Sequence, residues 1–268
     1  MNILIFLIAF AIFIYLLTLA LRLKTWVRSM RHDIYNIRDE LSTFKRSNEK
    51  ANAKILTAAS NIAAESVNAS CINSLGFEFP VFMGGPSIDT HHARNLLFLL
   101  QERKPQAILE LGSGSSTIII ARALQLMGAS PNRHISVDHE ERFLNNTKEL
   151  ARLNSVDELI QFEYCPLQPE DGFPHPWYSR IPALAGSLKF DFVLIDGPPA
   201  YEDGLGRTRE PALTVLRPYL ADNAVIILDD ANRVGEQNVV KAWQEKYPEF
   251  SLYHATEGKG VAIFTLGA

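Results

Sequence analysis

The first hydrophobic pattern along the chain is an unbroken apolar run. Residues 3–21 read ILIFLIAFAIFIYLLTLAL and carry no charge. A helix of about 20 apolar residues spans the hydrocarbon core of a bilayer, whereas a surface helix of a soluble protein keeps a polar face. A cleaved signal peptide is the rival interpretation, but Met1-Asn2 supplies no basic side chain and LALRLK is a poor cleavage site. The run therefore predicts a retained transmembrane anchor over residues 1–23.

The second pattern is a heptad repeat, which predicts a helical coiled-coil spacer over residues 24–66. Its positions, spaced alternately three and four residues apart, are Val27, Met30, Ile34, Ile37, Leu41, Phe44, Asn48, Ala51, Ile55, Ala58 and Ile62. Asn48 is the single polar residue at an a position, which is a device that fixes register in dimeric coiled coils. A lone amphipathic helix lying on the membrane or on the domain is the alternative. We expect self-association, and hence a homo-oligomer.

A stretch rich in Ser, Asn, Gly and Pro ends the helical pattern. Residues 66–87 read SVNASCINSLGFEFPVFMGGPS. These residue types favour turns and loops. We expect the helix to break here, and we assign residues 67–87 to a linker and domain entry.

The third pattern, over residues 88–268, alternates helix and strand. The predicted strands cover 107–111, 134–138, 160–164, 190–196, 224–230, 250–255 and 260–266, and the predicted helices cover 89–103, 117–128, 140–154 and 236–247. Such alternation predicts an α/β domain whose parallel sheet is covered on both faces. The last two strands are too close together for a helical crossover, so they should pair antiparallel.

Charge and cysteine content refine the location. Four basic residues, Arg22, Lys24, Arg28 and Arg31, follow the apolar run directly. Positive charge favours the cytoplasmic side, which predicts a single-pass protein of the inner (plasma) membrane with a cytoplasmic domain. The two cysteines argue against a disulfide scaffold and suit a reducing compartment. The net charge of −4 gives no general reason to expect a nucleic-acid partner.

Candidate functional residues stand at the ends of five predicted strands, where ligands bind in sheets of this kind. They are Glu110, Gly112, Asp138, Cys165, Asp196, Asp229 and Asp230. Each alone is as readily explained as a turn or helix cap. Five strand ends of this kind on one edge predict a ligand site.

The loop GSGSST after the first strand narrows the choice of ligand. It has no Lys, so it is not a phosphate-binding P-loop. A dinucleotide fingerprint needs a third small residue, but that position holds Thr117, and Glu110 would repel a pyrophosphate. S-adenosylmethionine, a cofactor with a cationic centre and no pyrophosphate, fits better. Asp138 is placed to accept hydrogen bonds from both of its ribose hydroxyls.

Six motifs in order carry a family resemblance. They are ILELGSGSST, ISVDHEE, PWYSR, FDFVLIDGPP, RTREPAL and VIILDDANR. Over about residues 80–266 the chain resembles the class I S-adenosylmethionine-dependent methyltransferases, specifically the bacterial subgroup near the catechol O-methyltransferase-like enzymes. The resemblance implies a Rossmann-like, seven-stranded, mostly parallel sheet with an antiparallel last strand. We therefore assign residues 88–268 to a methyltransferase domain.

The resemblance also implies roles for individual residues. Glu110, Gly112 and Gly114 would hold the methionine end of the cofactor. Ser116 of the same loop is also expected to bind the cofactor. Asp138 would hold the ribose, His139 would lie beside the adenine, and Cys165-Pro166-Leu167 would border it. Asp196 would face the methyl group and the acceptor.

Metal use is left open by the same resemblance. Metal-dependent relatives hold Mg²⁺ with an acid after strand four and an Asp-Asn pair after strand five, where this chain has Asp196, Asp229 and Asp230. Three hard oxygen ligands would suit Mg²⁺ or Ca²⁺. In the alternative, Asp229 and Asp230 cap a loop and pair with Arg233 or Arg209.

Methyl transfer to a hydroxyl needs a base or a metal, and we expect Asp196, with Asp229, to be catalytic. His175 and Tyr178 are candidates for lining the acceptor pocket, or else they pack around Trp177. His91 and His92 are expected to cap a helix or to form part of the wall on the cofactor side of the site. Arg209 either binds an anionic acceptor or folds its loop by pairing with an Asp.

Three functions remain open on the sequence. The first is a membrane-anchored methyltransferase that O-methylates a small-molecule or glycan acceptor, shaped by loops at residues 166–185 and 198–210. The second is an NAD-dependent oxidoreductase on a Rossmann-like sheet. The third is a non-catalytic membrane scaffold with a relic methyltransferase domain.

Overall fold

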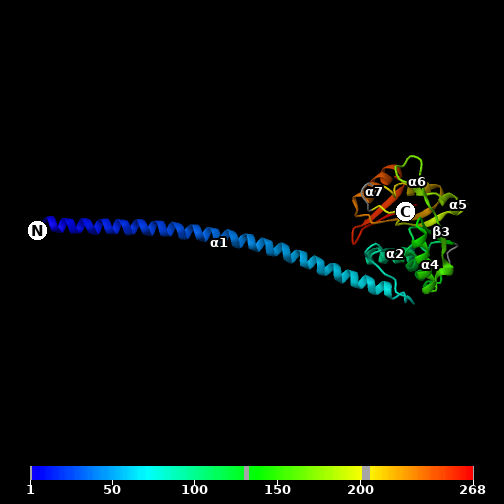
Figure 1. Cartoon of the computed structure of the whole chain (residues 1–268), viewed down its shortest axis with the longest axis horizontal. Coiled ribbons are helices and arrows are strands. Elements are labelled where there is room, and N and C mark those ends of the chain that lie inside the picture. The colour runs from blue at the N-terminus through cyan, green and yellow to red at the C-terminus, as the bar shows by residue number, and fades with distance from the viewer. Residues whose placement is uncertain (1, 130–132, 201–205, 268) are drawn as a thin grey trace. The chain divides into compact units, whose positions relative to one another are not determined.

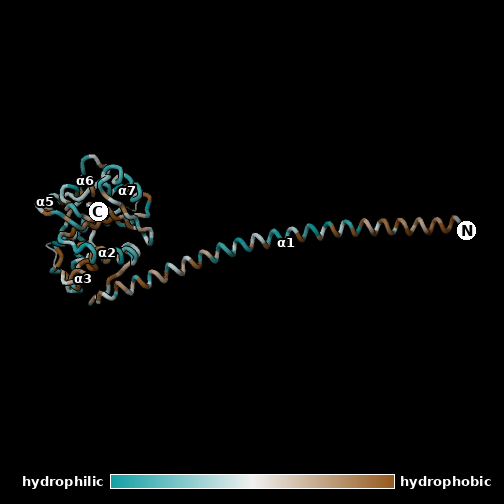
Figure 2. Tube along the Cα trace, turned by 180° about the vertical axis from the view of Figure 1, so that it is seen from behind, coloured by the Kyte–Doolittle hydropathy of each residue, from teal (hydrophilic) through white to brown (hydrophobic). Residues whose placement is uncertain are grey.

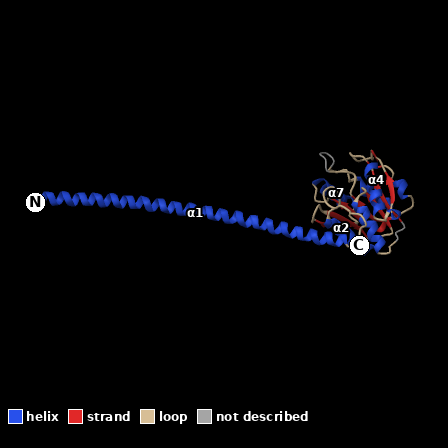
Figure 3. Cartoon of the chain, turned by 60° about the horizontal axis from the view of Figure 1, so that its bottom comes forward, coloured by secondary structure: helices blue, strands red, loops and turns tan. Residues whose placement is uncertain are grey.

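The computed structural model describes residues 2–129, 133–200 and 206–267 (Figure 1). It divides into two units, residues 1–63 and 64–268. Among the described residues, those of the N-terminal unit are all helical and every strand lies in the second unit (Figure 3).

Helix α1 (Asn2–Asn73) contains the whole apolar run and the whole heptad pattern. Its most apolar window has a mean hydropathy of 3.0 and none of that window is buried, so its length and composition allow it to cross a membrane. Figure 2 shows the continuous apolar run at its N-terminal end, followed by a mixed stretch.

The end of α1 differs from the expectation. The sequence predicts a helix break at residue 66, but the helix continues to Asn73. The side chains of Asn68 and Ile72 are buried in the second unit, where Ile72 joins an apolar cluster. Burial of this last part of the helix outweighs the weak helix propensity of its Ser and Asn residues.

The second unit holds a seven-stranded sheet with the order β3-β2-β1-β6-β7-β9-β8. The strands are β1 (Ala107–Leu111), β2 (Arg133–Asp138), β3 (Gln161–Tyr164), β6 (Phe190–Ile195), β7 (Leu220–Asp229), β8 (Phe250–Ala255) and β9 (Val261–Leu266). All neighbouring pairs are parallel except β7–β9 and β8–β9. The predicted Rossmann-like sheet, with its antiparallel last strand, is confirmed.

Each central strand buries both of its faces. Leu109 and Leu111 of β1 contribute to one apolar cluster, while Ile108 contributes to the cluster on the opposite face. Successive side chains of a strand point to opposite faces, so a strand with helices on both sides must be apolar throughout. This explains the continuous apolar runs in the sequence.

Helices connect and cover the strands. The longer ones are α2 (Thr90–Arg103), α3 (Ser115–Leu126), α4 (Glu141–Leu153) and α7 (Val234–Lys246). Short elements missed by the sequence analysis are helices α5 (Ile181–Ala185) and α6 (Pro211–Leu216), 3₁₀ turns η1 (Asp157–Leu159) and η2 (Arg217–Tyr219), and the hairpin of β4 (Leu167–Gln168) and β5 (Trp177–Tyr178). The five predicted strands whose ends carry the candidate site are all present, so these strand ends meet at one edge of the sheet.

Candidate active site

The loop after β1 is shaped by a close approach of two strand ends. Gly112 has φ +98°, and a Cβ there would lie 3.0 Å from the backbone nitrogen of Gly197, just after β6. A Cβ on Gly197 would overlap the hydroxyl of Tyr178. Gly112 therefore needs glycine for its positive φ and its close backbone contact, and Gly197 needs it because a side chain would overlap the Tyr178 hydroxyl.

Thr117, at the position of the missing third small residue, has a local role. Its Oγ1 accepts a hydrogen bond from the backbone nitrogen of Gly114 at 3.0 Å, where α3 begins. The side chain therefore caps the N-terminus of α3.

Glu110 lies beneath this loop. Its side chain is fully buried and accepts hydrogen bonds from the hydroxyls of Ser116 and Ser136. It does not line the cleft described below. The carboxylate supports the loop from below, and its predicted contact with the cofactor stays a prediction.

Asp138, at the end of β2, is held by backbone and side-chain donors. One carboxylate oxygen accepts hydrogen bonds from the backbone nitrogen and the hydroxyl of Ser113, both at 3.0 Å, and the other accepts from the backbone nitrogen of Glu140 at 2.8 Å. Burial alone would raise the pKa of Asp138, but hydrogen bonds from His139, Glu140 and Ser113 hold it below its ordinary value. Asp138 is therefore a fixed, ionised acceptor.

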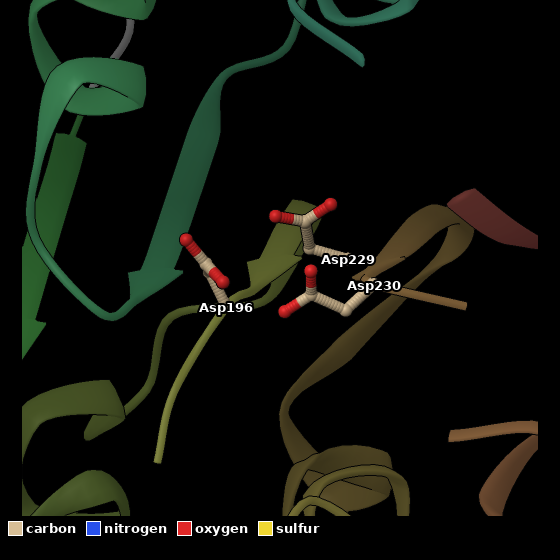
Figure 4. A group of neighbouring side chains, drawn as sticks. All are labelled: Asp196, Asp229 and Asp230. Carbon is tan, nitrogen blue, oxygen red and sulfur yellow. The ribbon is translucent and has the colours of Figure 1, made fainter. Parts of the chain in front are cut away.

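Three carboxylates gather where β6 and β7 end (Figure 4). Asp196 follows β6, Asp229 ends β7 and Asp230 comes next. One oxygen atom from each lies within 4.8 Å of the others. The predicted cluster therefore exists in space, in a spacing that a metal ion could bridge.

Each of these carboxylates already has a cationic partner. Asp229 lies 2.7 Å from Nδ1 of His92, and Asp230 lies 2.8 Å from Nη1 of Arg233. Arg209 lies 3.3 Å from a carboxylate oxygen of Asp196 and 3.5 Å from one of Asp230. Asp230 therefore has the arginine partners that the alternative interpretation predicts. The partner of Asp229 is instead His92, which the sequence does not predict.

The close packing of like charges shifts the pKa values apart. Burial, together with the neighbouring Asp229 carboxylate, raises the pKa of Asp196 well above its ordinary value. Burial would also raise the pKa of Asp229, but His92 reverses this and holds it below its ordinary value. Burial would lower the pKa of His92, and Asp229 reverses that as well. The result is an ion pair of His92 and Asp229 beside two carboxylates, Asp196 and Asp230, whose pKa values are raised.

A cleft of about 390 Å³ lies over this sheet edge. Of the predicted site residues, its lining includes Gly112, Gly114, Ser116, Asp138, His139, Asp196 and Asp230 but neither Glu110 nor Asp229. Tyr178 lines it too, whereas His175 and Cys165 do not. Ligand pockets commonly enclose about 300–1,000 Å³, so the cleft has the size of a small-molecule site.

Some lining residues were missed by the sequence analysis. Phe143 and Leu150 of α4 form an apolar wall, and Ser113 positions Asp138. The only sequence signal for this wall is the helical spacing of Phe143 and Leu150, which places the two side chains on the same face of α4. Within the predicted acceptor loop at 198–210, residues 201–205 lie outside the described part of the chain.

The family comparison bears on the same region of the chain. Residues 109–231 match the family model described as "Methyltransferase domain". This part of the chain is similar to methyltransferase domains. The match covers the glycine loop, Asp138, Asp196 and both Asp229 and Asp230, so the resemblance to class I S-adenosylmethionine-dependent methyltransferases is confirmed. No curated protein matches the chain.

Solved structures of methyltransferases share the fold of this chain. The O-methyltransferase TomG from Streptomyces achromogenes, solved with S-adenosylmethionine, has 16% identity and a TM-score of 0.53, over 76% of this chain and 97% of that one. A putative O-methyltransferase from Klebsiella pneumoniae has 16% identity and a TM-score of 0.51, over 76% and 90% of the two chains. The O-methyltransferase from Bacillus cereus, solved with S-adenosylhomocysteine, has 17% identity and a TM-score of 0.50, over 78% and 90%. At these identities the likeness establishes the fold.

Proposed function

We propose that the chain is a membrane-anchored S-adenosylmethionine-dependent methyltransferase that O-methylates a small-molecule or glycan acceptor. The observation that carries the proposal is the single cleft that joins the glycine loop, Asp138 and Asp196 within a methyltransferase domain. The glycine loop would hold the methionine end of the cofactor, with Ser116 beside it, and Asp138 its ribose hydroxyls. His139, which also lines the cleft, would border the adenine.

The acids of the cleft bear on the choice of cofactor. Asp196 and Asp230 line it together with Arg209, which lies 3.3 Å from Asp196, and Arg233, which lies 2.8 Å from Asp230, so their charges are largely offset. Asp138 also lines the cleft, and its pKa is held below its ordinary value, so its negative charge would repel a pyrophosphate. The electrostatic argument against a nicotinamide dinucleotide therefore rests on Asp138, because Glu110 is buried and already hydrogen bonded.

Asp196 is the proposed general base. S-adenosylmethionine, when bound, supplies a methyl group activated by a sulfonium. Asp196 would take the proton of the acceptor hydroxyl as the methyl group is transferred to that oxygen. Its raised pKa makes it a stronger base than an ordinary carboxylate. Positioning and exclusion of water by the cleft walls supply the rest.

Asp229 acts indirectly in this proposal. It does not line the cleft, and its carboxylate is paired with His92. Its negative charge raises the pKa of Asp196. We therefore assign Asp229 to tuning the base rather than to contact with the acceptor.

The decisive experiment is a pair of titrations on the full chain in detergent. We expect S-adenosylmethionine and S-adenosylhomocysteine to bind and NAD(H) not to bind. Tight binding of NAD(H) without binding of S-adenosylmethionine would support the oxidoreductase instead. Methyl transfer from labelled cofactor to extracts of small molecules and glycans then tests the acceptor class. If Asp138→Ala leaves the cellular role intact, the protein is a scaffold.

Location and assembly form the second part of the proposal. The apolar run of α1 would be the single membrane span, with the basic residues 22–31 and the domain on the cytoplasmic side. The heptad would join copies of the chain through residues 24–66, and residues 74–87, which follow the end of α1, would lead into the domain at 88–268. Protease protection in sealed vesicles of known orientation tests the sidedness.

A further inference from the structure

Arg209 is the side chain around which the acidic cluster is arranged. Its side chain is 3% exposed. Nε donates a hydrogen bond to the carbonyl oxygen of Pro198 at 3.1 Å, and Nη1 donates to that of Asp229 at 3.1 Å. Nη2 donates to the carbonyl oxygen of Asp196. The guanidinium thus ties the end of β6 to the end of β7.

The same guanidinium also faces the carboxylates. Nη2 lies 3.3 Å from a carboxylate oxygen of Asp196, and Nη1 lies 3.5 Å from Asp230 and 3.7 Å from Glu236. A planar fork with five donors is suited to bridging several oxygens at fixed positions. Its donors are all directed at oxygen atoms of the protein, so Arg209 is fully engaged in the fold and is not free to bind an anionic acceptor.

The cluster is close to electrically balanced without a metal ion. The acids are Asp196, Asp229, Asp230 and Glu236, and the cationic groups within 4.0 Å of them are Arg209, Arg233 and His92. A Mg²⁺ ion would need oxygens free of other cations and near-octahedral geometry. The residues present therefore do not fit a bound Mg²⁺.

We propose that Arg209 takes the place of a divalent cation in this cluster, so that the site works without a metal. Arg209 is a positioning residue: it holds the carboxylate of Asp196 toward the cleft and offsets its charge. Its role in methyl transfer rests on the proposed function. Its occupation of the cation position does not, and can be tested by metal binding alone.

The test uses Mn²⁺ as the probe, with the full chain in detergent and electron paramagnetic resonance to count free ions. We expect no stoichiometric binding to the wild-type protein or to Arg209→Lys, which keeps the charge. Arg209→Met removes the charge and leaves an acidic cavity. Because one positive charge a few ångströms away is lost, Mn²⁺ affinity should rise on the order of a hundredfold or more. Adding Asp230→Asn to Arg209→Met should abolish the new site.

Two results would overturn the inference. One is stoichiometric Mn²⁺ binding to the wild-type chain that Asp230→Asn removes. The other is a folded Arg209→Met protein, shown by retained S-adenosylhomocysteine binding, that gains no Mn²⁺ site. If Arg209→Met does not fold, the wild-type measurement decides alone. Failure of the methyltransferase proposal would instead appear as absent S-adenosylhomocysteine binding with the metal results unchanged.

Discussion

The first unit exposes large apolar side chains, whereas the sheet of the second unit buries them. In the first unit, Ile3 is 78% exposed and Phe44 and Ile62 are each 67% exposed. In the second, Ile108 and Leu111 are completely buried. A large exposed apolar surface marks an interaction site. The second unit therefore forms a core from its own chain, whereas the exposed apolar surface of α1 implies contact with other molecules, which we propose to be lipid and a second copy of the chain.

Cutting between the units should give the largest effect. Deletion of residues 1–63 should move the protein from the membrane pellet to the soluble fraction while S-adenosylhomocysteine binding is retained, because the second unit keeps its own core. Fractionation and calorimetry measure the two properties. A truncated protein that stays in the pellet would show that the domain, not α1, binds the membrane.

Replacing the proposed base should affect catalysis alone. Asp196→Asn should lower the rate of methyl transfer by a factor on the order of 10² to 10⁴ while cofactor affinity changes little. Because the pKa of Asp196 is raised, the wild-type rate should fall with decreasing pH at a value above that of an ordinary carboxyl group. A rate that is unchanged in Asp196→Asn would assign the base elsewhere.

Removing His92 should destabilise the domain without affecting α1. Loss of one partner from a buried ion pair costs about 3–5 kcal/mol, so His92→Ala should unfold at lower denaturant concentration, with His91→Ala as the matched control. The pKa of His92 is raised from its ordinary value of 6.5. Its contribution to stability is therefore complete below that pH and is lost as pH rises through the folded-state pKa. Equal stability of the two variants would contradict the pairing.

The predicted ribose ligand gives a smaller effect. Asp138→Asn should weaken S-adenosylhomocysteine binding by about 1.5–3 kcal/mol, which corresponds to roughly 10- to 150-fold. Asp171→Asn, an exposed carboxylate outside the cleft, should bind as the wild type does. Unchanged affinity in Asp138→Asn would remove this residue from the cofactor site.

The smallest effect is expected in the spacer. Asn48→Val should strengthen self-association and loosen its register, because the polar a residue trades stability for specificity. Asn36→Val, at a c position of the same heptad frame, serves as the control. Sedimentation in detergent gives the oligomer size, and a monomer in every case would refute the coiled coil.

Periodic segments were the part of the fold that the sequence predicted well. The strands of the central sheet are buried on both faces, so apolar runs such as that of β1 are visible without structural information. The β4–β5 hairpin and helices α5 and α6 were missed because elements of two to six residues show no period. The length of α1 was missed because burial of Ile72 depends on distant residues.

The candidate site also has a part that the sequence predicts and a part that it does not. Asp138, Asp196, Asp229 and Asp230 follow predicted strands, so topology alone brings them to one edge. The pairing of His92 with Asp229 joins residues 137 positions apart, and no local pattern reports it. Arg209 likewise contacts oxygens from three separate segments. Pairings of this kind depend on side-chain packing, which a single sequence does not display.

The contact between Gly197 and the hydroxyl of Tyr178 has an evolutionary consequence. The two residues are distant in sequence, yet a side chain at position 197 would occupy the space of the phenol oxygen. In related chains the two positions should therefore vary together. Alanine at position 197 should be found only where position 178 carries a ring without a hydroxyl or a smaller side chain, so the pair would mark which relatives share this form of the cleft.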